Sequence, residues 1–199
     1  MLIPLPQHHP NWRRLAELSA QGDPLNYGTS RCAYILFSEV MRHRARRVIE
    51  LGTGSGESTE AFLLALELTR GHLWTVDIRP RDEVVGRLGK RYGKRFTFHQ
   101  GDSLDFVATW TKGKADIIFI DTSHTYEQTL RELELFAPLL KEDGTIYLHD
   151  ALSHITYSDP QYGVMKAIET YREQNPGWTF KVFYTPYGLG EMKRKCEYS

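Results

Sequence analysis

Cysteine is scarce in this 199-residue sequence, and its two cysteines, Cys32 and Cys196, lie far apart. They form neither a CxxC pair nor a metal-ligand spacing, so they give no sign of a zinc site or a dithiol motif and are compatible with a reducing compartment. An excess of one charge is also lacking, because 25 Lys and Arg residues balance 25 Asp and Glu residues. No overall field draws the chain to nucleic acid or to an anionic membrane, so small-molecule or protein partners fit better.

Long hydrophobic runs are absent as well. No stretch approaches the ~18 apolar residues of a membrane span, and the segment Met1–Pro6 lacks the basic and apolar regions of a signal peptide. We therefore expect a cytoplasmic protein without a membrane partner. The densest basic run, Arg42–Arg47, precedes a buried-looking strand, and we interpret it as a solvated face near a helix C-terminus. Nucleic acid is not expected as a partner.

The length and composition favour a single domain over residues 1–199. With 41% hydrophobic residues, the chain can bury one sizeable core but is short for two domains. From Arg46 onward, short β-branched runs alternate with amphipathic stretches, which is typical of β-α units around a parallel sheet. We expect residues 1–45 to form helices, over 12–20 and 31–43, that cover an edge of the site. The expected core, residues 46–199, contains strands at 47–51, 72–78, 96–100, 116–121, 145–149, 179–184 and 190–195.

The end of the chain specifies the sheet further. The last two expected strands flank Pro186–Gly188, which leaves no room for a helix, so they must be antiparallel neighbours. The predicted fold class is therefore α/β: a doubly wound, Rossmann-like, seven-stranded and mostly parallel sheet with an antiparallel final strand and helices on both faces. An apolar stripe from Tyr126 to Leu140 predicts a helix, with Thr125 and Gln128 as its capping box.

The strongest motif is the glycine-rich turn Gly52–Gly56, which follows a strand and opens a helix. Glycines let the backbone turn sharply and approach a ligand, and the helix N-terminus then offers free N–H groups. The spacing is GxGxG, with Glu57 where a dinucleotide fingerprint needs its third glycine. This difference counts against NAD, although a nicotinamide-dependent oxidoreductase is retained as a rival interpretation.

The acidic Glu50, two residues before Gly52, completes a pattern that resembles the first motif, ExGxGxG, of the class I S-adenosylmethionine-dependent methyltransferases. The sheet that ends in a hairpin resembles the same family, and the resemblance covers roughly residues 29–195. It implies S-adenosylmethionine as the cofactor, with Thr29 and Ser30 closing over its methionine end. The first motif would contribute Glu50, Gly52, Thr53, Gly54 and Ser58 to the cofactor site.

Acidic residues also follow the next two strands. Asp77 ends the second strand, where a carboxylate can accept hydrogen bonds from both ribose hydroxyls, and the family uses this position in that way. We include its neighbour Ile78 in the cofactor site. Asp102 and Ser103 match the place where the family contacts the adenine amino group. Either acid alone is more typical of a turn or an N-cap, but their order on successive strand ends favours cofactor binding.

Two further carboxylates, Asp121 and Asp150, end the fourth and fifth expected strands and face the same crevice. Such oxygen ligands suit Mg²⁺ or another divalent metal. The pattern resembles the catechol-type and sugar-modifying metal-dependent O-methyltransferases, which place metal-binding acids at these strand ends. Asp121 would also contact the cofactor. Where the catechol-type pattern has Asp-Asn, this chain has Asp150-Ala151, so one ligand is missing or comes from elsewhere, and metal dependence is left open.

His124 stands three residues after Asp121, where the catechol-type enzymes carry a lysine that acts as general base. An imidazole can take the acceptor's hydroxyl proton, so we assign His124 and Asp121 to catalysis. A helix-capping role and a metal-ligand role for His124 are also open. His149 is a weaker candidate base, because we expect it inside a strand with its side chain in the core.

The resulting hypothesis is S-adenosylmethionine-dependent O-methylation of a small-molecule hydroxyl. The alternative from another class is a non-catalytic S-adenosylmethionine-binding protein. Methylation of a nucleic-acid base is not expected, because Asp121–His124 replaces the Pro-Pro-aromatic sequence that holds a flipped base. The methyl acceptor is the expected partner, and a homodimer is left open. The segment 152–163 is either a substrate lid or a solvent-facing crossover.

Overall fold

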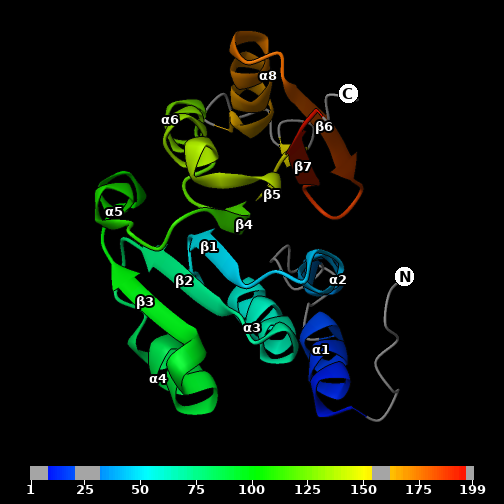
Figure 1. Cartoon of the computed structure of the whole chain (residues 1–199), viewed down its shortest axis with the longest axis vertical. Helices are drawn as coiled ribbons and strands as arrows, with labels where there is room; N and C mark the ends of the chain where they lie inside the picture. Colours follow the sequence, from blue (N-terminus) through cyan, green and yellow to red (C-terminus); the bar gives the residue numbers. More distant parts are fainter. Residues whose placement is uncertain (1–8, 21–31, 154–161, 196–199) are drawn as a thin grey trace.

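The computed structural model describes residues 9–20, 32–153 and 162–195 of the chain. A seven-stranded sheet in the order β3-β2-β1-β4-β5-β7-β6 crosses the molecule (Figure 1). Strands β1 to β5 run parallel, and β7 runs antiparallel to both β5 and β6. The predicted fold class is therefore confirmed. The strands are β1 (Arg47–Leu51), β2 (His72–Asp77), β3 (Phe96–Gln100), β4 (Ala115–Ile120), β5 (Leu140–Leu148), β6 (Trp178–Phe183) and β7 (Leu189–Arg194).

Helices cover both faces of this sheet (Figure 1). One face carries α1 (Pro10–Ala20), α2 (Ala33–His43), α3 (Glu57–Thr69) and α4 (Asp82–Tyr92). The other carries α5 (Ser103–Thr109), α6 (Tyr126–Phe136) and α8 (Val164–Gln174). None of the helices in the described ranges is both long and apolar enough to span a bilayer. Thr29, Ser30 and residues 154–161 of the expected lid lie outside the described residues.

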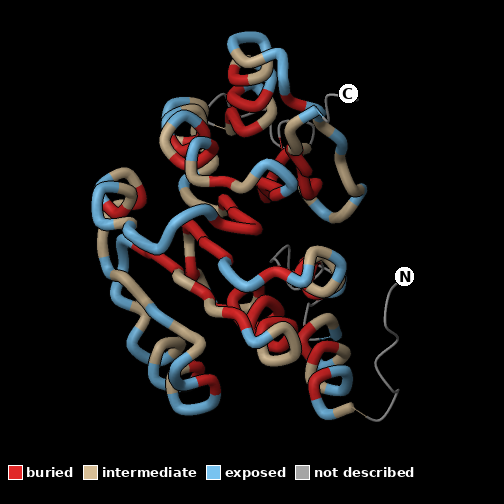
Figure 2. Tube along the Cα trace, viewed as in Figure 1, coloured by how far each residue is buried: buried red, intermediate tan, exposed pale blue. Residues whose placement is uncertain are grey.

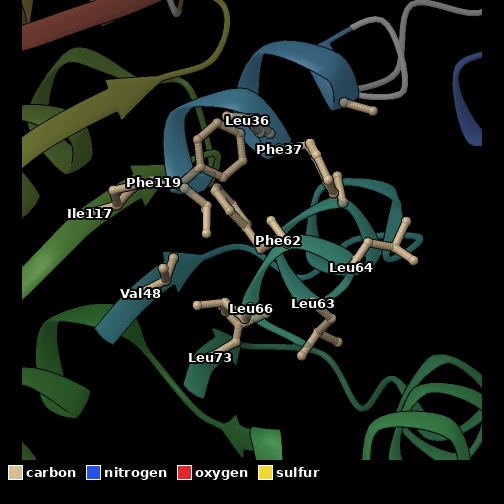
Figure 3. Packing of buried hydrophobic residues seen from close by; sticks show 14 of the residues in the cluster. Leu36, Phe37, Val48, Phe62, Leu63, Leu64, Leu66, Leu73, Ile117 and Phe119 are labelled. Carbon is tan, nitrogen blue, oxygen red and sulfur yellow. The ribbon is translucent and has the colours of Figure 1, made fainter. Parts of the chain in front are cut away.

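The strands divide their side chains between two apolar layers, because successive residues of a strand point to opposite faces. Val48 of β1 packs toward α3, whereas Ile49 packs toward α6. Every residue of β4 is buried, as expected for a central strand covered on both sides. Figure 2 shows the burial concentrated along the sheet and the inner faces of the helices. In Figure 3, Phe62 of α3 meets Phe119 of β4 edge to face, with ring centroids 5.7 Å apart.

The predicted helix stripe from Tyr126 to Leu140 is too long. Helix α6 ends at Phe136, a 3₁₀ turn η3 (Ala137–Leu139) follows, and Leu140 already belongs to β5. Pro138 explains the difference, because proline lacks the N–H that would continue an α-helix. The capping prediction is half right: Thr125 Oγ1 accepts the Gln128 N–H at 3.4 Å, but the Gln128 side chain donates to Ser103 and Glu132 instead.

A buried carboxylate ties three helices together on the α3 side. Glu60 of α3, only 1% exposed, accepts hydrogen bonds from Arg14 of α1 at 2.8 and 2.9 Å and from Arg87 of α4 at 2.6 Å. Arg91 and the Tyr92 hydroxyl each lie 3.4 Å from the same carboxylate. Burial alone would raise the pKa of Glu60, but these cations outweigh it, so the pKa is lowered. Glu60 therefore stays charged as the common anchor of α1 and α4.

We predict that Glu60→Gln lowers the free energy of unfolding by about 1–3 kcal/mol, because it removes the charged partner of several cations. Urea denaturation measures the change, and Glu169→Gln on the exposed face of α8 is the matched control. Since the folded-state pKa of Glu60 is lowered, its contribution is present above the unfolded pKa of about 4.3 and is lost as the pH falls. A difference from wild type that does not shrink below that pH would contradict the assignment.

Candidate active site

The glycine-rich turn brings the end of β1 against the end of β4. Gly52 has φ +92°, and a Cβ at that position would lie 1.9 Å from the backbone oxygen of Asp121. Only glycine allows this approach, since the backbone conformation and the space both exclude a side chain. Gly54 has φ +53°, but a Cβ there meets no atom within 4 Å. The turn is thus closed on the Asp121 side and open at Gly54.

An open cavity of about 530 Å³ lies beside this turn, at the carboxyl edge of the parallel strands. This is the edge at which open α/β sheets bind their ligands. Of the residues predicted to bind the cofactor, Gly52, Gly54, Asp77, Ile78, Asp102, Ser103 and Asp121 line the cavity. His124 lines it as well, together with Val76, Arg79, Arg81, Gly101, Thr122, Ser123 and Gln128.

Asp77 holds the glycine-rich turn from the neighbouring strand. Its Oδ2 accepts the backbone N–H groups of Thr53 at 3.2 Å and Gly54 at 3.0 Å, and the Arg81 Nε–H at 2.8 Å. Its Oδ1 accepts the Arg79 N–H at 2.9 Å. These donors outweigh the effect of burial, so the pKa of Asp77 is lowered and the group is a carboxylate at the cavity wall. Arg79 and Arg81, which stand two and four residues after Asp77, were not predicted to belong to the site.

Three other predicted cofactor residues lie beneath the turn. Glu50 is fully buried and accepts hydrogen bonds from the hydroxyls of Ser58 at 2.6 Å and Thr59 at 2.7 Å. Burial raises the pKa of Glu50 to about 7. The hydroxyl of Thr53 is bonded to that of Thr75 at 2.7 Å. Glu50, Thr53 and Ser58 are therefore not among the cavity-lining residues, and their direct contact with a cofactor stays a prediction.

The far wall of the cavity is built around Glu132, which sequence reasoning missed. This fully buried residue of α6 accepts hydrogen bonds from Ser103 Oγ at 2.6 Å, Thr122 Oγ1 at 2.9 Å and Gln128 Nε2 at 3.0 Å. Burial raises the pKa of Glu132 despite these donors. Asp102 caps α5 by accepting the Leu104 N–H at 2.8 Å, so the predicted cap and a place in the cavity wall coexist in one residue.

Two carboxylates and two imidazoles gather where β4 and β5 end. The ligand atoms of Asp121, His124, His149 and Asp150 all lie within 4.8 Å of one another. His124 Nε2 lies 2.9 Å from Asp121 Oδ1 and 3.2 Å from Asp150 Oδ2. His149 Nδ1 lies 2.6 Å from Asp150 Oδ2 and 3.4 Å from Asp121 Oδ1. We call these four residues the carboxylate-imidazole cluster.

The charges in the cluster stabilise one another. Burial would raise the pKa of Asp121, but the two histidines outweigh it and hold the pKa well below its usual range. Burial likewise disfavours the charged forms of His124 and His149, yet the carboxylates raise the pKa of both imidazoles. The donor set of two nitrogens and two oxygens matches what a divalent transition metal binds. The cluster can therefore hold protons or a cation between its carboxylates.

Backbone strain accompanies the cluster. His124 and Asp150 both have φ +59°, a left-handed conformation that non-glycine residues seldom adopt. Each such residue costs of order 1–3 kcal/mol and persists only where surrounding structure enforces it. His124 is also enforced from outside, because the Gly163 N–H donates to its carbonyl at 2.9 Å. Of the five non-glycine residues with positive φ in the described ranges, these two belong to the cluster, whereas Arg44, Arg70 and Tyr187 lie outside it.

The expectation that His149 lies inside a strand was wrong, although its side chain is buried as expected. Strand β5 ends at Leu148, so His149 lies directly beyond the strand and its ring joins the cluster instead of the apolar core. Its side chain is buried, with 5% exposed, whereas that of His124 is 26% exposed and lines the cavity. A histidine and an aspartate that both follow a strand would have indicated that His149 belongs to the site. That prediction required the exact end of the strand, which sequence patterns seldom give. In the catechol-type pattern an asparagine stands where this chain has Ala151, which has no ligand atom in its side chain. The His149 imidazole could take the place of that missing ligand.

We predict that Gly52→Ala lowers the free energy of unfolding by at least about 3 kcal/mol, because its Cβ would collide with the Asp121 backbone. Gly54→Ala is the matched control: it meets open space and should cost only about 1–2 kcal/mol, for the left-handed conformation. Urea denaturation of both variants tests the difference. Equal destabilisation would contradict the close packing of the turn on β4.

Two curated proteins are similar to this chain in sequence. O-methyltransferase hkm8 of Aspergillus hancockii is 29% identical over 124 residues, which cover 61% of this chain and 48% of that protein. O-methyltransferase ankF of Aspergillus thermomutatus is 26% identical over 144 residues, covering 65% of this chain and 60% of that protein. This chain thus spans about half to three fifths of the length of these two relatives.

A solved structure shares the fold. The S-adenosylhomocysteine-bound methyltransferase PaMTH1 of Podospora anserina superposes with a TM-score of 0.74 at 16% identity, covering 94% of this chain and 89% of that one. A family model described as a methyltransferase domain matches residues 49–151, from within β1 to just beyond the cluster. Because that match spans more than half of the chain, the protein belongs to the methyltransferase-domain family, and the predicted resemblance to class I S-adenosylmethionine-dependent methyltransferases is confirmed.

Proposed function

We propose that this chain transfers the methyl group of S-adenosylmethionine to a hydroxyl oxygen of a small molecule. The observation that carries the proposal is the double position of Asp121. This residue lines the cavity beside the glycine-rich turn and also belongs to the carboxylate-imidazole cluster. A cofactor in the cavity would therefore lie next to groups that can hold and deprotonate an acceptor. The names of both Aspergillus relatives support oxygen as the methylated atom.

Several cavity residues suit the cofactor. The open side of the turn at Gly54 lets a ligand approach the backbone closely. Oδ2 of Asp77 already accepts three donors, but Oδ1 accepts only the Arg79 N–H and therefore keeps a lone pair for a ribose hydroxyl. Ile78 is 69% exposed although apolar, which suits packing against an adenine ring. Asp102 lies on the same wall and can accept from the adenine amino group.

The reaction needs an acceptor oxygen in line with the sulfur-methyl bond. That oxygen forms the new bond to the methyl carbon while the carbon-sulfur bond breaks and its electron pair stays on sulfur, which gives S-adenosylhomocysteine. The hydroxyl proton must leave, and His124 is the better placed imidazole, because it lines the cavity while His149 is buried. Asp121 and Asp150 orient His124 Nε2 through the contacts of 2.9 and 3.2 Å.

The cluster also fits a divalent metal by its donor chemistry. Asp121, His149 and Asp150 would hold the ion and leave His124 facing the cavity. A bound metal would supply Lewis-acid stabilisation of an acceptor oxygen. Imidazole ligands favour Mn²⁺, Fe²⁺, Co²⁺ or Zn²⁺ over Mg²⁺, which prefers an all-oxygen shell. This donor set shifts the expectation from Mg²⁺ toward a first-row transition metal.

We predict that S-adenosylhomocysteine raises the melting temperature, because a ligand of the folded state stabilises it by mass action. Asp77→Ala should weaken its binding by roughly 1.5–3 kcal/mol, since a charged acceptor of a ribose hydroxyl is lost. Calorimetric titration measures the affinity, with the exposed Asp105→Ala as the matched control. Tight binding of NADH with no response to S-adenosylhomocysteine would instead support the nicotinamide-dependent rival.

We predict that His124→Ala lowers kcat by roughly 10²–10⁴ while leaving the affinity for S-adenosylhomocysteine nearly unchanged, because a general base acts mainly in the transition state. Methyl transfer from labelled S-adenosylmethionine to a panel of phenols and sugars supplies the assay. His99→Ala, which changes an imidazole outside the cluster, is the matched control.

The same variant separates the roles of His124. Partial recovery at high Mn²⁺ would identify His124 as a metal ligand, because concentration offsets a weakened metal affinity. Full activity at ordinary metal concentration would exclude both chemical roles. If the wild-type chain binds S-adenosylhomocysteine but methylates nothing in a broad acceptor panel, the non-catalytic alternative gains support.

A further inference from the structure

A second cavity lies at the opposite, amino edge of the parallel strands. It has a volume of about 460 Å³ and is lined by nine residues. Six of them are cationic and none is acidic: Arg46, Arg47, Arg70, Lys94, Arg95 and Lys141. The remaining three are Gly71, His72 and Trp74. We call these nine residues the basic cleft.

The cations come from segments that are far apart in the sequence. Arg46 and Arg47 stand where β1 begins, and Arg70 caps the end of α3. Lys94 and Arg95 belong to the 3₁₀ turn η2 (Gly93–Arg95), immediately before β3. The sheet therefore collects positive charge from the starts of neighbouring strands into one concavity. The chain as a whole carries a formal net charge of zero, so this is a local concentration.

Little of this charge is neutralised within the protein. The adjacent acid Asp116 accepts the backbone N–H groups of Arg46 and Arg47, each at 2.8 Å, and binds the ammonium group of Lys141. Over the ranges that the structure describes, the side chains of Arg46, Arg70 and Lys94 have no ion pair or hydrogen bond. Three cationic groups therefore remain available to an anion from solvent.

The location of the cations at helix ends explains only part of the arrangement. A cation near a helix C-terminus interacts favourably with the helix dipole, and Arg70 follows the end of α3 in this way. Collecting six cations around one concavity adds mutual repulsion that such pairings do not remove. The pKa of His72 is lowered mainly by burial, and the charge of Arg95 within the cleft and that of Lys112 outside it lower the pKa further.

An aromatic surface accompanies the charge. The rings of His72 and Trp74 lie with their centroids 4.1 Å apart, and His72 Nε2 is held by Thr97 Oγ1 at 2.8 Å. Both rings are partly exposed and line the cleft. Aromatic faces beside cationic groups can stack against a planar ring of a ligand.

We propose that the basic cleft binds a small molecule that carries two or more phosphate groups. Arginine offers a planar fork of donors that matches phosphate oxygens, and lysine adds a point charge. The volume lies within the usual range for small-molecule sites, whereas nucleic acid would require an extended basic surface. A nucleoside polyphosphate and an inorganic polyphosphate share this chemistry. Only the nucleoside polyphosphate has a planar base that could stack on the rings of His72 and Trp74.

Inorganic tripolyphosphate is the primary probe, because it lacks the adenosine that the cofactor cavity could recognise. Calorimetric titration of the full chain should give one site at low salt, with affinity at least about tenfold above that for orthophosphate and falling as salt is added. The melting temperature should rise with tripolyphosphate. ADP and GDP binding more tightly than pyrophosphate would identify a nucleotide as the ligand, and equal affinities would identify the phosphates alone.

The variant Arg70→Asn removes one of the unpaired charges, and asparagine tolerates the left-handed φ of +58° at that position; Lys94→Glu reverses a second unpaired charge. Each should weaken tripolyphosphate binding at least about tenfold, whereas the exposed Arg13→Glu of α1 should stay within about twofold of wild type. Unliganded melting temperatures check that the variants fold. Equal weakening by Arg13→Glu, no preference over orthophosphate, or tighter binding of a single-stranded RNA oligonucleotide would overturn the proposal.

Discussion

The site depends on backbone hydrogen bonds that continue beyond the ends of the parallel strands. In each of them, the first residue after one strand donates its N–H to a carbonyl oxygen of the neighbouring strand. The Gly52 N–H donates to Val76 of β2 at 2.8 Å, and the Asp121 N–H donates to Leu51 of β1 at 2.8 Å. The His149 N–H continues the series by donating to Ile120 of β4 at 3.0 Å. These bonds align the first residues past β1, β4 and β5 on one edge. The glycine-rich turn and the carboxylate-imidazole cluster are therefore built on one rigid sheet.

This alignment explains why buried charges are tolerated in the cluster. Isolated burial would push the carboxylates and imidazoles toward their neutral forms, because desolvation penalises charge. The strand ends instead bring opposite charges within 2.6–3.4 Å, and the pKa shifts of Asp121, His124 and His149 all follow the partner charges, against the effect of burial. Each charge of the cluster therefore faces an opposite charge, whereas His149 Nε2, on the other side of its ring, is buried with no hydrogen-bond partner among the described residues.

Much of this architecture could be predicted from local patterns. The alternation of strands and helices, the hairpin around Pro186 and the glycine-rich turn are short-range signals, and each led to the observed element. Strand ends were less predictable, because Pro138 stops α6 early and places Leu140 in β5. A second small difference occurs at the other end of β5. The strand ends at Leu148 and not at His149, so the His149 side chain lies beyond the strand and belongs to the cluster. Glu132 was missed because its partners, Ser103 and Thr122, are brought to it only by the packing of α6.

The basic cleft illustrates a limit of the same kind. The run Arg42–Arg47 was interpreted as a solvated helix end, yet Arg46 and Arg47 meet cations from α3, η2 and β5 that no local pattern connects to them. The two edges of the sheet differ in charge. At the carboxyl edge, the carboxylates of the cluster are paired with imidazoles, whereas at the amino edge most of the cations of the cleft have no acidic partner in the described part of the chain. The five residues of β1 separate these edges by roughly 17 Å at about 3.3 Å per residue. At this separation a phosphorylated ligand in the cleft would not contact an acceptor bound at the proposed methyl-transfer site, so any effect of one on the other would be indirect.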